Sequence, residues 1–324
     1  MWSFIKKKFT TPKDQRSTNK SLSNPSIIIK IPVSKWKRAH SWGDYHMAVL
    51  LKKQLENLGH PVLIQVSSEW DNAESKTYDV AIVFRGPKRY NVKTNQLNIM
   101  WNISHPDSIS IDEYQDYNQV FIASDYWANK IAKEVTVPVE SMWQCTDPER
   151  FLEVTEQEKQ RYRQQLLFVG NSRKINRRII ADLLPIAYDL AVYGQDWEKL
   201  IPNQYIKAKY INNNEVYKYY GSADILLNDH WDDMREKGFV SNRIFDGLAC
   251  GAFIITDKVR SMDQLEQFVQ TYNTKDELVK WIEYYLNHPE KREELAQKGK
   301  VFIINNHTFK QRAQRFSEVI LNSA

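Results

Sequence analysis

The stretch from residue 238 to residue 257 carries residue types that suit an anion-binding loop. A polar segment, Ser241-Asn242-Arg243, leads into a short helix whose apolar residues recur at three- and four-residue spacing. The apolar run 252–255 that follows predicts a buried parallel strand. A helix N-terminus presents free backbone N–H groups, and an arginine in its first turn adds a charge suited to phosphate. We therefore expect these three residues to contact a phosphate.

Asp246 lies one helical turn beyond Arg243. Its carboxylate is placed to accept hydrogen bonds from the hydroxyls of a sugar, so we assign it to the reacting or ribose end of a substrate. The alternative interpretation is that the whole stretch is an ordinary helix–turn–strand unit of a core.

A second cationic segment follows the predicted strand 166–169. After Gly170, residues 171–178 contain Arg173, Lys174 and Arg177 at what we expect to be the start of a helix. Cations at a helix N-terminus oppose the helix dipole unless an anion sits there, and such a local conflict indicates a functional site. The alternative is a solvated basic turn. The segment lacks the Gly-Lys-Ser/Thr ending of a P-loop.

Polar loops follow three predicted strands in the first half of the chain. A histidine in such a loop donates or accepts a proton near neutral pH, and this makes His105 the best candidate for proton transfer. For His105 the alternative is a structural histidine before a proline turn. For His46 the alternative is a residue on the surface of a helix. The loop residues that we expect at a substrate are Gly43, His46, Arg85, Ser104 and His105.

The elements that must position these residues alternate between short apolar strands and helices. This pattern predicts parallel sheets with helices on both faces, whose ligands bind beyond the carboxyl ends of the strands. At 324 residues the chain is long enough for about two domains. We place a basic flexible segment at residues 1–26, a first domain at 27–150 and a second domain at 151–324.

Charge and cysteine content exclude several classes of protein. The formal net charge is +5, and residues 1–26 alone account for all of it, so the rest of the chain is formally neutral. A nucleic-acid-binding protein would spread basic charge over its folded body, and we expect no nucleic-acid partner. The two cysteines indicate a reducing, cytoplasmic compartment. Residues 1–9 pair aromatic residues with lysines, which suits either contact with the inner face of a membrane or a basic tail.

The segment Asp246-Gly247-Leu248-Ala249-Cys250-Gly251 resembles the donor-binding motif of GT-B glycosyltransferases. The resemblance is to the branch that includes CgeB-like proteins and family-4-like retaining enzymes, in which an acidic residue precedes a small-x-Ala-Cys-Gly turn. The family-4 form has a second glutamate eight residues earlier, where this chain has Gly238, and this departure favours the CgeB-like variant. The segments Trp101-Asn102-Ile103-Ser104-His105-Pro106 and Tyr193-Gly194-x-x-Trp197 also resemble that branch.

The resemblance implies an α/β protein with two Rossmann-like domains that face each other and a last helix that crosses back to the first domain. It implies that residues 27–150 form the acceptor-binding domain and residues 151–324 the nucleotide-sugar-binding domain. It implies transfer of a sugar, with retention of configuration, from a nucleotide-diphospho-sugar to a hydroxyl of a glycan or lipid-linked glycan. The nucleotide would lie near Gly194, Tyr210 and the strand end at Asn228. The alternatives are a GT-B-like epimerase, a sugar-phosphate transferase or a non-catalytic nucleotide-sugar-binding protein.

The carboxylates and the histidine at residues 229–233 suggest a site for a divalent metal, which binds oxygen ligands in fixed geometry. A metal-dependent single-domain glycosyltransferase would place such a cluster within its first βαβ series, whereas here it comes after two. We therefore expect neither a metal nor any other cofactor, and interpret the cluster as a loop beside the substrate.

Overall fold

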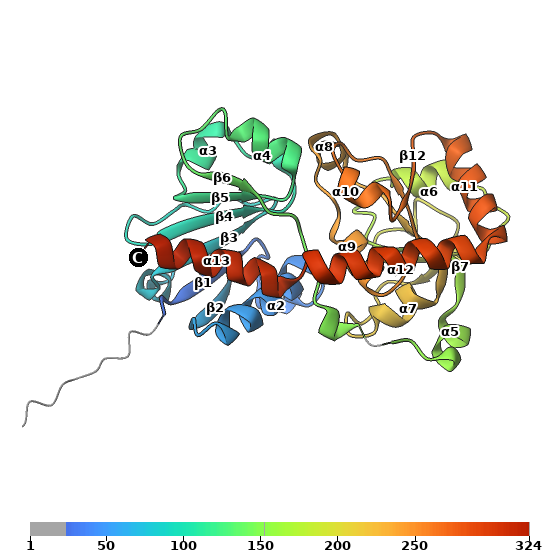
Figure 1. The fold of residues 1–324 in the computed structure, drawn as a ribbon, viewed down its shortest axis with the longest axis horizontal. Coiled ribbons are helices and arrows are strands. Elements are labelled where there is room, and N and C mark those ends of the chain that lie inside the picture. The colour runs from blue at the N-terminus through green and yellow to red at the C-terminus, as the bar shows by residue number, and fades with distance from the viewer. Residues whose placement is uncertain (1–23, 152, 324) are drawn as a thin grey trace, which may run out of the picture.

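A computed structural model describes residues 24–151 and 153–323, so the expectation of membrane contact through residues 1–9 lies outside the described residues. The chain forms two six-stranded sheets, with strand orders β2-β1-β3-β4-β5-β6 and β12-β11-β10-β7-β8-β9. Every strand pairing within them is parallel. The two sheets and their helices lie side by side in Figure 1. The fold class expected from the sequence is confirmed.

The N-terminal domain is built around central strands that are buried along their whole length. Each residue of β1 and of β3 is buried, because helices and loops cover both faces of a parallel sheet. The strands are β1 (Ile27–Ile31), β2 (Val62–Val66), β3 (Val80–Arg85), β4 (Leu97–Asn102), β5 (Gln119–Ile122) and β6 (Val139–Ser141). The helices are α1 (Trp36–Ala39), α2 (Gly43–Asn57), α3 (Ile111–Gln115) and α4 (Asp125–Ile131).

The C-terminal domain repeats the same alternation of strand and helix. Its strands are β7 (Gln164–Val169), β8 (Leu190–Tyr193), β9 (Ile206–Ala208), β10 (Ala223–Asn228), β11 (Ile254–Asp257) and β12 (Gln270–Tyr272). Its helices are α5 (Glu156–Tyr162), α6 (Arg178–Leu183), α7 (Val216–Ser222), α8 (Asp232–Lys237), α9 (Asn242–Ala249), α10 (Asp263–Glu266), α11 (Lys275–Asn287) and α12 (Pro289–Asn306). Within the described residues, no helix is long and apolar enough to cross a bilayer.

The two sheets face each other at the carboxyl ends of their strands. Helix α8 follows β10 and contacts the 3₁₀ turn Pro106–Ser108, which follows β4. Lys237 forms an ion pair with Asp107, and the Ser124 hydroxyl donates a hydrogen bond of 2.6 Å to the Lys237 carbonyl. A Cβ on Gly238, whose φ is +80°, would lie 2.7 Å from the Ser124 Oγ. The close approach of the two domains therefore requires glycine at the position where family-4-like enzymes have a glutamate.

The last helix, α13 (Phe309–Ser323), joins the core of the N-terminal domain. Figure 1 shows α12 and α13 running one after the other along both domains. Phe316 is fully buried and packs edge-on against Trp101 and Phe121, with ring centroids 5.7 and 5.2 Å away. Arg312 donates to the carbonyls of Trp143 and Gln144 at 2.8 and 3.2 Å. The segment that connects the N-terminal to the C-terminal domain is thus bonded to the helix that returns to the N-terminal domain.

Two expected elements differ from the structure. The helix expected after Gly170 begins only at Arg178, because Arg173 and Lys174 both have left-handed backbones with φ of 55° and 63°. The Ser172 hydroxyl donates to the Asp196 carbonyl at 2.6 Å and holds this segment as a loop. The sequence of residues 205–211 also predicts a strand, but β9 ends at Ala208 and leaves Tyr210 in the following loop. The cations after β7 therefore lie on a loop and not in a helical turn.

Phe316→Ala should lower the free energy of unfolding by about 3–5 kcal/mol, because it removes a fully buried aromatic ring and leaves a cavity. Urea unfolding followed by circular dichroism measures the loss. Leu321→Ala on the same helix is the control: its side chain is half exposed, and we expect a change within about 0.5 kcal/mol. Equal effects of the two substitutions would contradict the packing of α13.

Candidate functional site

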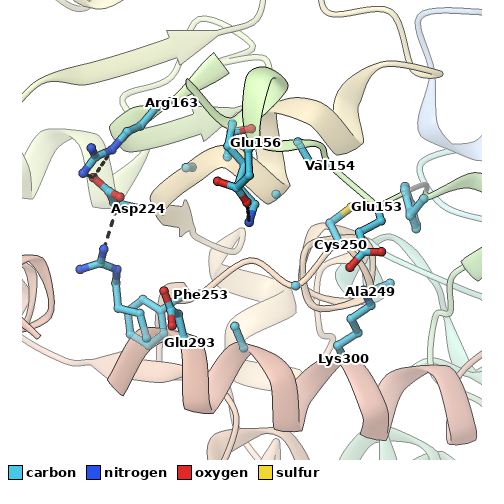
Figure 2. Close-up of a pocket in the computed structure, with 18 of the residues that line it drawn as sticks. Glu153, Val154, Glu156, Arg163, Asp224, Ala249, Cys250, Phe253, Glu293 and Lys300 are labelled. Carbon is cyan, nitrogen blue, oxygen red and sulfur yellow. Dashed lines mark hydrogen bonds and ion pairs between the residues drawn. The ribbon is translucent and has the colours of Figure 1, made fainter. Parts of the chain in front are cut away.

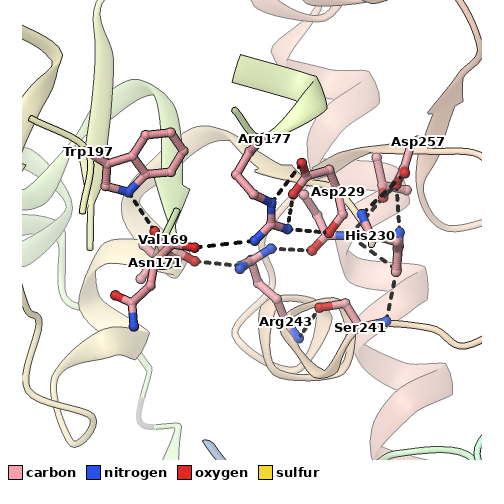
Figure 3. Close-up of polar contacts among 12 residues, drawn as sticks. Val169, Asn171, Arg177, Trp197, Asp229, His230, Ser241, Arg243 and Asp257 are labelled. Carbon is pink, nitrogen blue, oxygen red and sulfur yellow. Dashed lines mark hydrogen bonds and ion pairs between the residues drawn. The ribbon is translucent and has the colours of Figure 1, made fainter. Parts of the chain in front are cut away.

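Two arginines join the carboxyl ends of β7 and β10 (Figure 3). The Arg243 guanidinium donates through Nε to the Val169 carbonyl at 2.7 Å and through Nη1 to the Asn228 Oδ1 at 2.5 Å. Arg177 is buried and donates through Nε to the Asp229 carboxylate at 3.1 Å. Burial and the neighbouring Arg177 lower the pKa of Arg243, while Asp229 opposes that shift. Asp229 is therefore the counter-charge that makes this pair of cations stable.

A buried histidine and aspartate fix the loop before α9. The His230 Nδ1 lies 2.6 Å from the Asp257 Oδ1, and the Ser241 backbone N–H donates to the His230 Nε2 at 2.9 Å. Because Nε2 accepts, the proton of a neutral ring sits on Nδ1 and is donated to Asp257. Burial would raise the pKa of Asp257, but its contacts with His230 lower it overall. Sequence reasoning missed Asp257, since nothing in the sequence links it to residue 230.

This network uses one of the amides that we expected at a phosphate. The Ser241 N–H is bonded to His230, and the Arg243 N–H to the Ser241 hydroxyl at 3.4 Å. Within residues 24–151 and 153–323, the Asn242 N–H has no acceptor. The Ser241 amide is therefore unavailable to a ligand, whereas that of Asn242 is available.

Asp246 touches the segment that connects the two domains. Its carboxylate accepts from the Thr146 hydroxyl at 2.7 Å and from the Asn242 side-chain amide at 3.0 Å. Burial raises the pKa of Asp246 to about 6, and the charge of Arg150 opposes the shift. The carboxylate therefore lies beside both the first turn of α9 and the connection between the domains.

Across the domain boundary, charged groups of both sheets lie near one another. Burial raises the pKa of Asp44, in the first turn of α2, to about 6, and Arg173 of the C-terminal domain opposes this shift. Burial also lowers the pKa of His105, and Arg173 acts in the same direction. The His105 Nδ1 lies 2.8 Å from the Ser104 hydroxyl. The structure thus brings three of the predicted residues, Arg173, His105 and Ser104, to one region.

Asp44 was missing from the predicted site. Among the described residues it has no ion-pair partner within 4.0 Å and no side-chain hydrogen bond to another residue. The signal was present in the sequence, because a carboxylate follows the carboxyl end of β1 at a helix start. Gly43 next to it has no atom within 4 Å of the place a Cβ would take, so this helix start is open.

Arg85 does not face a substrate, and its assignment is wrong. Its side chain is 2% exposed, and its Nε lies 2.6 Å from the Glu113 Oε1 in a buried ion pair. A second nitrogen donates to the Ser108 carbonyl at 2.8 Å. The end of β3 turns this residue into the interior of its own domain, where it binds the loop that carries His105.

Arg177 and Asn228, both expected at a substrate, have their polar groups used within the protein. Arg177 is held by Asp229, and the Asn228 amide donates to the Thr256 hydroxyl at 2.9 Å. His46 has its Nε2 2.9 Å from the His40 carbonyl, and burial lowers the pKa of its ring. These residues support the loops around the site.

Gly170 and Gly194 are explained by packing. A Cβ on Gly194, whose φ is +146°, would lie 2.1 Å from the Gly170 carbonyl oxygen. A Cβ on Gly170 would lie 2.6 Å from the Arg243 Nη2. Tyr210 is 52% exposed, and Lys174 is also exposed. The exposed side chains of these loops are therefore the ones free to contact a ligand.

A separate pocket lies at the amino-terminal ends of the strands of the C-terminal sheet (Figure 2). It has a volume of about 450 Å³ and is lined by Asp224 at the start of β10, by Cys250 at the end of α9, and by Glu153 and Lys300. Its walls carry both signs of charge. None of the residues predicted at a substrate lines it.

The GT-B class of glycosyltransferases is defined by two parallel sheets that meet at the carboxyl ends of their strands. A last helix in this class returns to the first domain. Residues 171–318 match the family model described as glycosyl transferase-like. The sucrose-phosphate synthase of Thermosynechococcus elongatus superposes with a TM-score of 0.70 at 12% identity, over 92% of this chain and 98% of that one. The expected class, a GT-B glycosyltransferase, is confirmed.

Other similar proteins are a spore protein and two DNA-modifying enzymes. The spore protein CgeB of Bacillus subtilis (strain 168) is 26% identical over 151 residues, 42% of this chain and 47% of CgeB, so the match spans about half of that relative. An α-glucosyltransferase in complex with UDP and a 13-mer DNA gives a TM-score of 0.65 at 10% identity, over 92% of this chain and all of that one. The β-glucosyltransferase of T4 phage with UDP-glucose gives 0.57 at 13% identity, over 91% and 98%. The structural likenesses establish the fold.

Arg177→Ala and Arg173→Ala should separate a structural arginine from a ligand-binding one. The first leaves Asp229 as a buried unpaired charge and should cost about 3–5 kcal/mol of stability. The second removes an exposed side chain and should change stability by less than about 1 kcal/mol. Thermal unfolding of both variants measures the difference, and a larger loss for Arg173→Ala would contradict this division.

Proposed function

We propose that this chain transfers a sugar from a nucleotide-diphospho-sugar to a hydroxyl of a glycan or lipid-linked glycan. The observation that carries the proposal is the approach of Arg173, on the C-terminal domain, to Asp44 and His105 on the N-terminal domain. A cation from one domain opposite a carboxylate and an imidazole from the other suits a reaction in which a phosphate leaves and a hydroxyl attacks.

The leaving group dictates the chemistry of the donor side. As the glycosidic bond breaks, the nucleoside diphosphate gains negative charge that the protein must stabilise. Arg173 and Lys174, on the loop after β7, and the unoccupied Asn242 N–H supply positive charge and a hydrogen bond there. Three such donors make a metal ion unnecessary in this proposal, and no cofactor enters it.

Asp246 is proposed to hold the ribose of the nucleotide and His105 to contact the sugar or the acceptor. Retention of configuration follows from the likeness to family-4-like enzymes alone. UDP is the first nucleotide to test, since the α-glucosyltransferase and β-glucosyltransferase neighbours bind it. Their DNA is not carried over to this chain, because the protein outside residues 1–26 has no net charge.

The affinity for UDP should rise with pH through about 6, because an ionised Asp246 is the better acceptor of ribose hydroxyls. The pKa of Asp246 is raised in the folded protein, so its ionisation lowers the free energy of unfolding as the pH rises through that value. Bound UDP offsets this loss. Isothermal titration calorimetry between pH 5 and pH 7.5 measures the dependence. Asp246→Asn should reduce this dependence to the part that comes from the terminal phosphate of UDP itself.

Asp44 has a raised pKa in the same range, so Asp44→Asn is the matched control. It should leave the pH dependence of UDP binding in place, since Asp44 lies on the acceptor side. A flat pH profile in the unaltered protein would contradict the role of Asp246.

The activity itself is tested by incubating the protein with UDP-, GDP-, CDP- and TDP-sugars and measuring slow hydrolysis. A GT-B transferase releases nucleoside diphosphate when water replaces the acceptor. Arg173→Ala should lower this release by about 10²-fold, in line with the loss of one oxyanion-type donor. If none of the four donors is hydrolysed or raises the melting temperature, the proposal is wrong.

A further inference from the structure

A groove on the N-terminal domain lies outside the residues discussed so far. It runs between α2 and β2, the edge strand of the sheet, and has a volume of about 510 Å³. Trp36, Tyr45 and Val49 line one side, and Leu63 lies on the other. Trp36 is 43% exposed and Val49 is 39% exposed, so apolar surface is left open to solvent.

The aromatic side chains of the groove are held in place. The Trp36 indole Nε1 donates to the Glu69 carboxylate at 2.6 Å. Tyr45 packs edge-on against Trp36, with ring centroids 6.2 Å apart and planes at 86°. An indole fixed in this way binds with little loss of side-chain freedom, and its face suits the apolar C–H face of a sugar ring.

Three cations adjacent to Trp36 in the chain have no ion-pair partner among the described residues. Lys35, Lys37 and Arg38 flank Trp36 on the exposed α1 segment. Within the described residues, no carboxylate lies within 4.0 Å of any of the three. In contrast, Lys52 and Lys53 inside the groove are neutralised by Glu56 and Glu149, each at 2.6 Å. The unpaired positive charge is therefore concentrated at the aromatic end.

The aromatic end of the groove is also the end next to the proposed site. Tyr45 lines the groove and directly follows Asp44, which faces the C-terminal domain. From Tyr45 to Asn57 the groove follows α2 for twelve residues, about 18 Å at the rise of an α-helix. A chain-like acceptor whose end lies at Asp44 would extend along this groove.

We propose that the groove between α2 and β2 binds an anionic glycan, with sugar rings on Trp36 and acidic groups on Lys35, Lys37 and Arg38. The inference rests on the proposed function and names the substrate class of its acceptor side. Carboxylate or phosphate groups on the glycan would neutralise the unpaired cations, and its uncharged rings would cover the apolar walls.

Two other classes of anionic partner fit these features less well. A membrane surface contacts protruding side chains, whereas this surface is concave and carries the Glu69 carboxylate bonded to Trp36. A nucleic acid would need basic charge over a wide face, but the protein outside residues 1–26 is formally neutral. A local cluster of three cations beside an aromatic platform matches spaced acidic sugars.

Titration calorimetry of the full chain in the presence of UDP tests the assignment. The probes are hexagalacturonate, which carries a carboxylate on each sugar, and neutral maltohexaose. We expect hexagalacturonate to bind at least about tenfold more tightly than maltohexaose, and its affinity to fall as salt is raised. Lys37→Glu with Arg38→Glu, and separately Trp36→Ala, should each weaken hexagalacturonate about tenfold or more.

The matched control reverses two exposed cations elsewhere, Lys133→Glu with Lys275→Glu. It should change the affinity by less than about twofold. Trp36→Phe keeps a ring without the bond to Glu69 and should recover part of the affinity lost in Trp36→Ala. Circular dichroism checks that each variant is folded.

Equal affinity for the two oligosaccharides, or no effect of the groove substitutions, would overturn the proposal. So would binding only to phosphatidylglycerol vesicles or only to a single-stranded DNA 20-mer, lost in the same variants. Stabilisation by UDP and slow donor hydrolysis are measured on the same variants and depend on the C-terminal domain. If these persist while hexagalacturonate does not bind, the groove assignment fails and the proposed function stands.

Discussion

The packing of the buried Arg177 guanidinium beside the partly buried guanidinium of Arg243, at the carboxyl ends of β7 and β10, is the constraint on which the C-terminal domain depends. Arg177 and Arg243 repel each other, and a low-dielectric surrounding strengthens that repulsion. The Asp229 carboxylate, the Val169 carbonyl and the Asn228 amide oxygen compensate for it. Each partner lies at the carboxyl end of β7 or β10, or immediately after it. The loops that follow these strands are therefore held by polar contacts at their first residues.

The same contacts determine which groups remain for a ligand. Arg177 and much of Arg243 are used inside the protein, and His230 uses the Ser241 amide. What is left exposed is the left-handed turn of Arg173 and Lys174 and the amide of Asn242. These contacts hold the start of a loop whose exposed cation Arg173 faces the other domain.

The fold was largely predictable from the sequence, and the site only in part. The strands around β1 and β3 are continuous apolar runs, and such runs identify a covered parallel strand without knowledge of its partners. The start of α9 was predictable because Ser241 is an N-cap residue before a periodic apolar pattern. The helix expected at residue 171 was wrong, because the bond from Ser172 to Asp196 joins segments 24 residues apart and leaves no local signal.

Side-chain roles were harder to predict than positions. Arg85 ends a strand and Arg173 follows one, and the two look alike in the sequence. Yet Arg85 pairs with Glu113 in the interior, whereas Arg173 faces the other domain. The difference comes from the partners that the tertiary fold supplies, and a single sequence does not name them. Gly238 shows the opposite case. Its departure from the family-4-like motif was visible in the sequence, but its reason, the contact with Ser124 of the other domain, requires the structure.

The connection between the domains links their relative placement to the donor side of the site. Thr146 donates its hydroxyl to Asp246, and its backbone N–H donates to the His307 carbonyl at 3.0 Å. The first connection between the domains therefore contacts directly the carboxylate that we assign to the ribose, and the second, at His307, reaches it through Thr146. Closure of the domains that moved these crossings would change the hydrogen bonds of Asp246, whose pKa of about 6 makes its charge sensitive to them. With Asp246 in its proposed role at the ribose, domain position and donor affinity are coupled through this one carboxylate.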